Sequence, residues 1–343
     1  MSDKPATEPE VKAVNAPIVT VASSAPVDAD DSEPTSDYAS TINTSFTQSI
    51  TSSVTDYVFE NGRRYHAYQE GKYTMPNDET EQDRLDLQHH VHMVLLGGAL
   101  HVAPIKEVHN VLDCGTGTGI WSIMFAEDHP EAVVLGVDLS PIQPKWVTPN
   151  VKFEVDDLEL PWTFPVNHFD FIYSKYLNNS IKSWSTYISQ MYTHLKPGGY
   201  VEISELDMEL KCNDSSYAGS KLEVYMENFT KGAHEAGLRF WGVEETTRIL
   251  EEKGFLDIKR HTFYQPYGAW PKDKKQKYLG ATVGAILESG FAAYGMALFT
   301  RTLGMTKDEA QKICDEAWTE VISKKVHAFQ EVWILVARKP EDA

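Results

Sequence analysis

Short apolar runs and amphipathic segments alternate through the middle of the chain. Five runs rich in Val, Ile, Leu and Phe predict strands, over residues 108–115, 132–140, 151–157, 169–175 and 200–207. Helical spacing predicts helices over residues 118–130 and 183–199, which end at prolines or glycines. Strands that alternate with helices are joined by right-handed crossovers. The pattern therefore predicts an α/β fold with a mostly parallel sheet and helices on both faces.

The regions that flank this alternation are mainly helical. A helix is expected to begin near Asn77, a residue suited to an N-cap, and helical patterns return over residues 220–253 and 272–327. Two late strands are predicted over residues 256–267 and 331–339. The sequence thus predicts helical cap insertions added to the sheet.

Composition and charge exclude several classes of protein. The 343 residues are 42% hydrophobic, which is typical of a globular protein with a sizeable core. A net charge of −19 disfavours direct binding to nucleic acid. The 3 cysteines form no CxxC pair, so neither a disulfide framework nor a metal site is expected. No apolar run approaches the roughly 18 residues of a membrane helix, and no secretory signal is visible, so we expect a cytoplasmic protein without a membrane partner.

The stretch "VLDCGTGTGIW", residues 111–121, places Gly115, Gly117 and Gly119 where the first strand passes into a helix. Because glycine weakens regular structure by roughly 0.5–1 kcal/mol, the cluster indicates a sharp turn or the close approach of a ligand. Ligands of open α/β sheets bind beyond the carboxyl ends of the strands. The dinucleotide pattern GxGxxG needs a glycine where this chain has Ile120. The stretch instead fits GxGxG preceded by an acid, Asp113.

Acidic residues also end the next two predicted strands. Asp138 follows Gly119 by 19 residues, a spacing at which a carboxylate can accept both ribose hydroxyls of S-adenosylmethionine or of NAD. Asp157 ends the third strand, with Asp156 as an equal neighbour. Structural roles are the alternatives: Asp138 as a helix cap, and Asp113 as an organiser of the turn.

These motifs, in this order, resemble those of class I S-adenosylmethionine-dependent methyltransferases, whose fold is a Rossmann-like sheet. The resemblance implies that the glycine turn holds the methionine and ribose of the cofactor, and that Asp157 and Leu158 face its adenine. "FDFIYSK" resembles the family's fourth-strand motif. The residues expected to bind S-adenosyl-L-methionine are Asp113, Gly115, Thr116, Gly117, Gly119, Asp138, Leu139, Asp157, Leu158, Tyr173 and Tyr65.

A closer resemblance is to the LaeA-type fungal methyltransferases. It rests on "NGRRYHAYQEGKYTMPNDETEQDRLDLQHH", on "SPIQP" after Asp138 and on "HLKPGGYVEISELD", and it covers about residues 57–207. The chain departs from the family pattern at Cys114, at Tyr173 and Lys175 (His and Arg in the family), and at Ser183. These departures fall on the substrate side, so the resemblance carries no substrate identity.

The resemblance implies one of two roles. Some members are tailoring enzymes that methylate a natural product, and others are nuclear regulators of secondary metabolism that act with velvet-type proteins. We expect a methyltransferase for a small-molecule intermediate of fungal secondary metabolism. A nuclear regulator acting through protein partners is the alternative. A third interpretation, a binding scaffold without catalysis, is disfavoured by the intact glycine turn and Asp138.

No catalytic base is assigned from the sequence. The cofactor carries the activated methyl group, so the protein must mainly align donor and acceptor and exclude water. Candidates for a base are Tyr173, Ser174, Lys175, His89, His90 and His92, and packing is the alternative for the histidines. Candidates for other cofactor contacts, or for surface and packing roles, are Tyr65, Tyr68, Tyr73, Arg63 and Arg64. Residues 291–313, rich in Met, Phe, Tyr and small residues, form either core or the wall of a pocket for an apolar or aromatic acceptor.

The chain is expected to divide into a tail and one domain. Residues 1–55 have the Ser-, Thr- and Pro-rich composition of a disordered acidic tail. The methyltransferase domain is predicted over residues 56–343. Its expected parts are an N-terminal helical segment (56–104), a cofactor-binding half (105–207), and the helical cap insertions with the last strands (208–343).

Overall fold

The computed structural model describes residues 58–60, 62–65 and 75–343. The tail predicted for residues 1–55, together with Tyr68 and Tyr73, lies outside the described residues.

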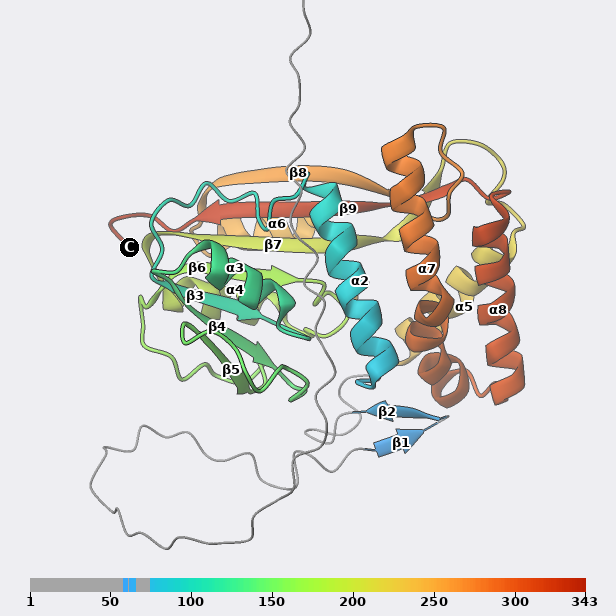
Figure 1. Ribbon diagram of the computed structural model, residues 1–343, viewed down its shortest axis with the longest axis horizontal. Helices are drawn as coiled ribbons and strands as arrows, with labels where there is room; N and C mark the ends of the chain where they lie inside the picture. The colour runs from blue at the N-terminus through green and yellow to red at the C-terminus, as the bar shows by residue number, and fades with distance from the viewer. Residues whose placement is uncertain (1–57, 61, 66–74) are drawn as a thin grey trace, which may run out of the picture. The chain divides into compact units, whose positions relative to one another are not determined.

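A seven-stranded sheet forms the centre of the described chain (Figure 1), in the order β5-β4-β3-β6-β7-β9-β8. The five strands from β5 to β7 are parallel, and β9 runs antiparallel to both β7 and β8. The prediction of a mostly parallel α/β sheet is therefore confirmed. The strands are β3 (Asn110–Cys114), β4 (Val133–Asp138), β5 (Val151–Val155), β6 (Phe169–Lys175), β7 (Leu195–Cys212), β8 (Leu256–Pro266) and β9 (Ala328–Arg338).

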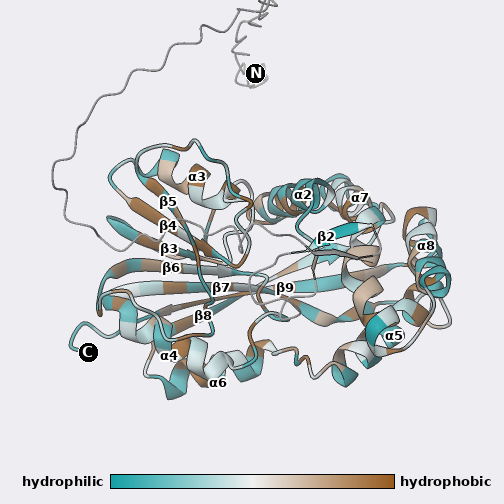
Figure 2. Cartoon of the chain, turned by 90° about the horizontal axis from the view of Figure 1, so that it is seen from below, coloured by the Kyte–Doolittle hydropathy of each residue, from teal (hydrophilic) through white to brown (hydrophobic). Residues whose placement is uncertain are grey.

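Helices cover both faces of this sheet because its central strands are apolar on both sides. Figure 2 shows α3 (Ile120–Asp128) on one face, and α4 (Trp184–His194) with α6 (Val243–Glu252) on the other. Each face has its own core cluster. Trp121 and Phe125 of α3 pack on one side, and Trp184 and Ile188 of α4 pack on the other.

A cap of helices surrounds one end of the sheet, where β7 and β9 extend (Figure 1). It comprises α2 (Glu79–Leu95), α5 (Lys221–Glu235), α7 (Lys274–Ala297), the π-helix η1 (Leu298–Thr302) and α8 (Lys307–Ser323). Of the predicted parts, the N-terminal segment contributes α2 to the cap and residues 208–343 contribute the other helices except α6, which lies on a face of the sheet (Figure 2). The helical pattern predicted over residues 220–253 consists of two helices, α5 and α6, and that over residues 272–327 consists of α7, η1 and α8. Gly237 and Gly304, with φ of +73° and +70°, end helical stretches because the left-handed conformation suits glycine.

The first turn of α2 differs by one residue from the prediction. Asp78, not Asn77, is the N-cap, and its side chain accepts a hydrogen bond from the Glu81 backbone. A short hairpin of β1 (Val58–Glu60) and β2 (Arg63–Tyr65) precedes this helix. Arg63 binds both oxygens of Asp78, at 2.6 and 2.8 Å, and so joins the hairpin to the cap residue.

One helical span of the described chain is long and apolar enough to cross a membrane, contrary to the sequence expectation. Residues 274–302, which comprise α7 and η1, contain a window with a mean hydropathy of 1.3. Within the fold, 67% of that window is buried. A helix in the core of a folded domain is buried to a similar extent, so these properties also fit a core helix.

Glu202 is a buried carboxyl group on β7, with 0% exposure. One oxygen accepts hydrogen bonds from the Val102 and Ala103 backbones at 2.8 and 2.7 Å, and the other has no partner among the described residues. Burial raises the pKa of Glu202 to about 8, from an ordinary value of 4.5. A raised carboxyl pKa means that folding favours the protonated form. The stabilisation is therefore complete below the ordinary value and is lost as the pH rises through about 8.

We expect Glu202→Gln to remove this dependence. Between pH 5 and pH 9, the wild-type chain should lose roughly 2–4 kcal/mol of unfolding free energy relative to the variant. Urea unfolding at both pH values measures the difference. Glu205, whose pKa is raised similarly, is present in both proteins, so its effect cancels. Parallel pH profiles for the two proteins would contradict the prediction.

Candidate functional site

The glycine turn lies between β3 and α3 at the carboxyl end of the sheet. Gly115, Gly117 and Gly119 have φ of +69°, +58° and +81°, conformations that other residues rarely adopt. A Cβ on Gly115 would lie 2.5 Å from Leu177, and one on Gly119 would overlap the Phe153 ring. A Cβ on Gly117 would meet only Leu85 within 4 Å, at 3.7 Å. Two of the glycines therefore serve packing as well as the turn, while Gly117 faces open space.

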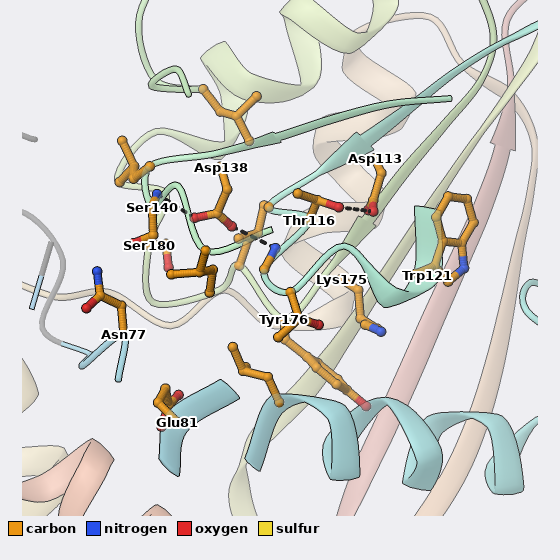
Figure 3. Close-up of a pocket in the computed structure, with 18 of the residues that line it drawn as sticks. Asn77, Glu81, Asp113, Thr116, Trp121, Asp138, Ser140, Lys175, Tyr176 and Ser180 are labelled. Carbon is orange, nitrogen blue, oxygen red and sulfur yellow. Dashed lines mark hydrogen bonds between the residues drawn. The ribbon is translucent and has the colours of Figure 1, made fainter. Parts of the chain in front are cut away.

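Asp138 joins the end of β4 to this turn. Its Oδ2 accepts a hydrogen bond from the Gly117 backbone at 2.8 Å, and its Oδ1 accepts one from the Ser140 backbone at 2.9 Å (Figure 3). A carboxylate oxygen has more than one lone pair, so these bonds leave acceptor capacity toward a ligand. Asp138 is thus beside the turn, as its spacing predicts.

Asp113 organises the turn from inside. Thr116 and Ser122 donate hydroxyl hydrogen bonds to the same oxygen, Asp113 Oδ2, at 2.6 and 2.7 Å. Asp113 is only 3% exposed, and burial raises its pKa despite these hydrogen bonds. It also lines the cavity above the turn. Asp113 therefore organises the turn, and its place in the cavity lining is compatible with the predicted contact with the cofactor.

The cavity above the turn brings together most of the predicted cofactor-binding residues. Asp156 and Asp157 both line it, so the choice between them stays open. The Asp157 side chain accepts a hydrogen bond from the Glu159 backbone at 3.0 Å, which fixes the loop after β5. The predicted residues that line the cavity are Asp113, Gly115, Thr116, Gly117, Asp138, Leu139, Asp157 and Leu158.

Three predicted residues do not line this cavity. Gly119 lies beneath it, at the N-cap of α3. Tyr173 is fully buried because Trp121 covers it, with ring centroids 4.0 Å apart and the planes 3° from parallel. Tyr65 packs instead under the Arg301 guanidinium, whose carbon lies 5.6 Å from the ring centroid.

Arg63 and Arg64 also lie outside the cavity lining. Arg63 is bound to Asp78, and Arg64 donates to Asn77 and Glu79. A contact of either arginine with the cofactor is therefore not supported, because local carboxylate and amide partners hold both side chains.

The structure adds a wall that the sequence interpretation missed. Buried or half-buried residues along one face of α2 line the cavity, together with two residues before the helix: Pro76, Asn77, Glu81, Leu85, Gln88 and His89. The signal for this face was present, since Glu81, Leu85, Gln88 and His89 recur at helical spacing. This face is easily overlooked because polar residues of a helix are usually expected to face the solvent.

Lys175 is the cation in this lining. It extends from the end of β6, two residues beyond Tyr173, and its Nζ lies 3.3 Å from His89 Nδ1. Burial lowers the pKa of Lys175 to about 8, while the charges of Asp113 and Asp86 oppose that shift. Burial and the neighbouring Lys175 lower the pKa of His89 to about 3. At neutral pH the pair is therefore a neutral imidazole beside a cationic amine.

Comparisons with known proteins identify relatives of this chain. A methyltransferase domain family matches residues 87–259. Methyltransferase pytC of Aspergillus terreus is 37% identical over 295 residues, which cover 85% of this chain and 91% of pytC. The secondary metabolism regulator LAE1 of Cochliobolus heterostrophus is 36% identical over 290 residues, which cover 82% of this chain and 94% of LAE1. Among solved structures, phosphoethanolamine N-methyltransferase 2 of Haemonchus contortus matches 79% of this chain and 54% of its own, at 18% identity and a TM-score of 0.45.

The fold, the glycine turn and the family match define an S-adenosylmethionine-dependent methyltransferase of class I. Within this class, the chain belongs to the LaeA-type fungal methyltransferase family, which includes the pytC and LAE1 proteins. The residues of the cavity fit the cofactor, because open space lies above Gly117 and the Asp138 carboxylate stands beside it.

We expect Asp138→Ala to weaken S-adenosylmethionine binding by about 1.5–3 kcal/mol, since hydrogen bonds to a charged group are lost. Calorimetry on the purified protein measures the change. Asp170→Ala is a matched control, because Asp170 also accepts two backbone hydrogen bonds, from His109 and Asn110, but does not line the cavity. Equal affinities for Asp138→Ala and the wild type would contradict the assignment.

Proposed function

We propose that the protein methylates a small-molecule intermediate of secondary metabolism. The observation that carries this proposal is a second cavity beside the first. Gln88 and Tyr176 line both cavities, so the cofactor cavity and the second cavity meet at these two side chains. The second cavity lies among α2, α5, α7 and the late strands, and its wall is largely aromatic and aliphatic. Concave, mostly apolar sites with a few polar groups are typical of small-molecule binding.

The backbone at the junction of the two cavities supports a functional role. Tyr176 has a φ of +58°, a conformation that is costly for an aromatic residue. The Tyr176 hydroxyl lies 3.3 Å from His92 Nδ1, a contact that helps hold the ring against α2. Strained residues persist where the surrounding structure holds them, often at binding sites.

The cofactor supplies a methyl group activated on a sulfonium sulfur. The residues of this chain have the remaining tasks. The glycine turn and Asp138 would hold the cofactor, the face of α2 covers the cavity, and Tyr176 and Gln88 lie where the donor and acceptor cavities meet. Enclosure by these elements aligns the reactants and excludes water.

The alternative is that the protein acts on or with another protein. Relatives named as regulators of secondary metabolism support this alternative. In that case velvet-type proteins and the nucleus are the proposed partners and location. For the small-molecule enzyme we propose a cytoplasmic location and no direct contact with nucleic acid or membrane, consistent with the net charge of −19.

Label transfer tests the proposal. Purified full-length protein is incubated with methyl-labelled S-adenosylmethionine and a fungal extract separated into small-molecule and protein fractions. Asp138→Ala provides the background. Label in the small-molecule fraction, above this background, is the expected result. Label confined to protein would reject the small-molecule proposal in favour of the regulator.

A further inference from the structure

We infer that the second cavity binds a neutral aromatic molecule that carries a secondary amide or lactam, held between Gln88 and Gln265. This inference rests on the proposed function and names the chemical class of its acceptor. Three properties of the cavity support the inference: its wall is largely apolar, it carries little charge, and two of its buried side chains have unpartnered polar atoms.

The wall of the second cavity offers aromatic ring surfaces. Six aromatic residues besides Tyr176 line it: Tyr225, Phe229, Phe240, Tyr267, Phe291 and Tyr294. Each of the three tyrosine hydroxyl groups already makes one hydrogen bond within the protein. The Tyr225 hydroxyl donates to the Phe291 carbonyl at 2.9 Å, and the Tyr267 hydroxyl donates to Gln330 Oε1 at 3.0 Å. The Tyr294 hydroxyl accepts from Arg84 at 2.8 Å. These rings therefore present apolar surface, which suits an aromatic or aliphatic ligand.

The cavity carries little charge at neutral pH. No Lys, Arg, His or Asp is among the described residues that line it, and Glu205 is its one carboxyl group. Glu205 accepts a hydrogen bond from the Leu177 backbone at 2.6 Å, and burial raises its pKa to about 8. A largely protonated carboxyl group neither attracts a cation strongly nor neutralises an anion. The wall thus favours an uncharged ligand.

Two glutamines in the lining have unpartnered polar atoms. Gln88, on α2, and Gln265, on β8, are only 6% and 4% exposed. Neither Gln88 Nε2 nor Gln265 Oε1 makes a hydrogen bond of good geometry among the described residues, although the Gln88 amide lies near enough to the Tyr176 hydroxyl to oppose the burial that raises the pKa of Tyr176. A buried polar atom without a partner costs about 1–3 kcal/mol, so a ligand that binds both atoms regains that energy. One atom needs an acceptor and the other a donor, and a secondary amide carries both in one group.

Gln330 shows what a structural glutamine looks like in the same cavity. Its Nε2 donates to the Asp207 carbonyl at 2.7 Å, and its Oε1 accepts from Tyr267. Both ends of its amide are used within the protein. Gln330 therefore provides the matched comparison: replacing it should destabilise the fold, whereas replacing Gln265 should not.

Probe binding to the full-length protein, saturated with S-adenosylmethionine, tests the inference. The probes are benzanilide, its hydrocarbon analogue trans-stilbene, the cation 4-phenylbenzylamine and the anion 4-phenylbenzoate. Calorimetry should show benzanilide binding at least tenfold more tightly than each of the other three. In Gln265→Leu the preference over stilbene should fall below about threefold, with a melting temperature no lower than that of the wild type and unchanged cofactor affinity. Gln330→Leu should lower the melting temperature.

Several results would overturn the inference: equal binding of benzanilide and stilbene, a preference for a charged probe, binding of none of the four, or a preference that survives in Gln265→Leu. These results are separable from failure of the proposed function. If label is transferred to small molecules but benzanilide is not preferred among the probes, only the proposed class of acceptor is rejected. Benzanilide preference with label confined to protein would reject methylation of a small molecule while leaving the cavity's chemistry intact.

Discussion

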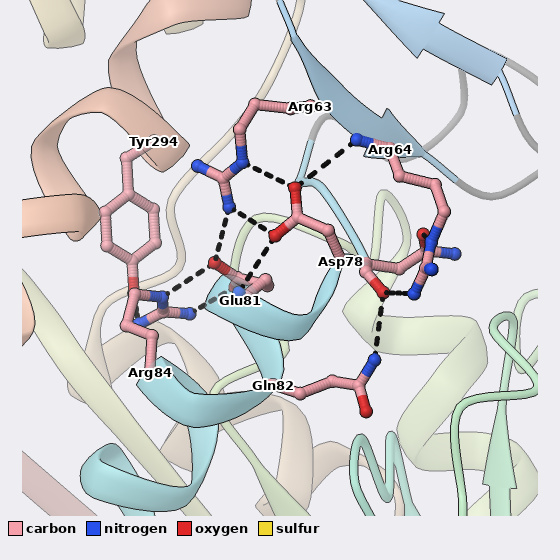
Figure 4. Close-up of polar contacts among 8 residues, drawn as sticks. Arg63, Arg64, Asp78, Glu81, Gln82, Arg84 and Tyr294 are labelled. Atoms are coloured by element: carbon pink, nitrogen blue, oxygen red, sulfur yellow. Dashed lines mark hydrogen bonds and ion pairs between the residues drawn. The ribbon is translucent and has the colours of Figure 1, made fainter.

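Arg84→Met is expected to lower the free energy of unfolding by about 3–5 kcal/mol, because it leaves a buried carboxylate without its main partner. Arg84 and Glu81 are 5% and 2% exposed, and the guanidinium binds both carboxylate oxygens, at 2.9 and 2.6 Å (Figure 4). Arg63 approaches Glu81 at 4.0 Å, which is too far to replace a bidentate pair. Urea unfolding without cofactor measures the loss.

Two further variants define the cause of that loss. Replacing both members of the pair, as Glu81→Gln with Arg84→Met, should restore part of the stability because no isolated charge remains. Arg248→Met is the exposed control: Arg248 lies 3.8 Å from Glu252, and both side chains are more than half exposed. It should leave stability close to the wild type. An Arg84→Met protein as stable as Arg248→Met would show that the buried pair has no special role.

The sheet and the glycine turn could be predicted because their signals are local and independent. An apolar run, a GxGxG turn and an acid 19 residues later each occupy a few adjacent positions. Each of them is also fixed by backbone geometry. Asp138 beside Gly117 follows from the fact that neighbouring parallel strands end at the same edge of the sheet.

Tyr173 shows where such reasoning stops. Its position near the end of β6 follows from the strand pattern, but the pattern does not show that Trp121 from α3 would cover its ring. Lys175, two residues further along the same strand, reaches the cavity instead. Tyr173 and Lys175 lie on one face of the same strand, and packing against other elements decides which of them is covered. No local sequence motif predicts that packing.

The second cavity could not be predicted from the sequence for a similar reason. Gln88 and Gln330 lie on α2 and β9, 242 positions apart, and only the folded cap brings them to one wall. The segment of residues 291–313 supported two interpretations, core and pocket wall. The structure assigns Phe291 and Tyr294 to the lining and Phe299, fully buried, to the core.

Gly119→Ala and Gly117→Ala are expected to fail in different ways, although both glycines have positive φ. Any side chain there costs roughly 1–2 kcal/mol in backbone strain. At Gly119 the added Cβ would also overlap Phe153, with Cζ as the nearest atom and Cε1 at 2.8 Å. Phe153 lies on β5 and packs with the core cluster on the α3 face of the sheet, so its ring has little freedom to move. We expect Gly119→Ala to lose about 2–4 kcal/mol of unfolding free energy.

At Gly117 the added methyl group would meet no protein atom closer than 3.7 Å, so only the strain remains. Gly117 and Leu85 both line the cavity, however, so that methyl group would lie at the cavity wall, where the resemblance places the ribose and methionine of the cofactor. Gly117→Ala should therefore fold nearly normally and bind S-adenosylmethionine at least tenfold more weakly, as measured by calorimetry beside urea unfolding. If both variants lost equal stability, or if Gly117→Ala kept its affinity, the glycines would serve the turn alone. If Gly119→Ala loses mainly stability and Gly117→Ala loses mainly cofactor affinity, then the absence of a side chain at Gly119 serves packing. The absence of a side chain at Gly117 would then serve the close approach of the cofactor.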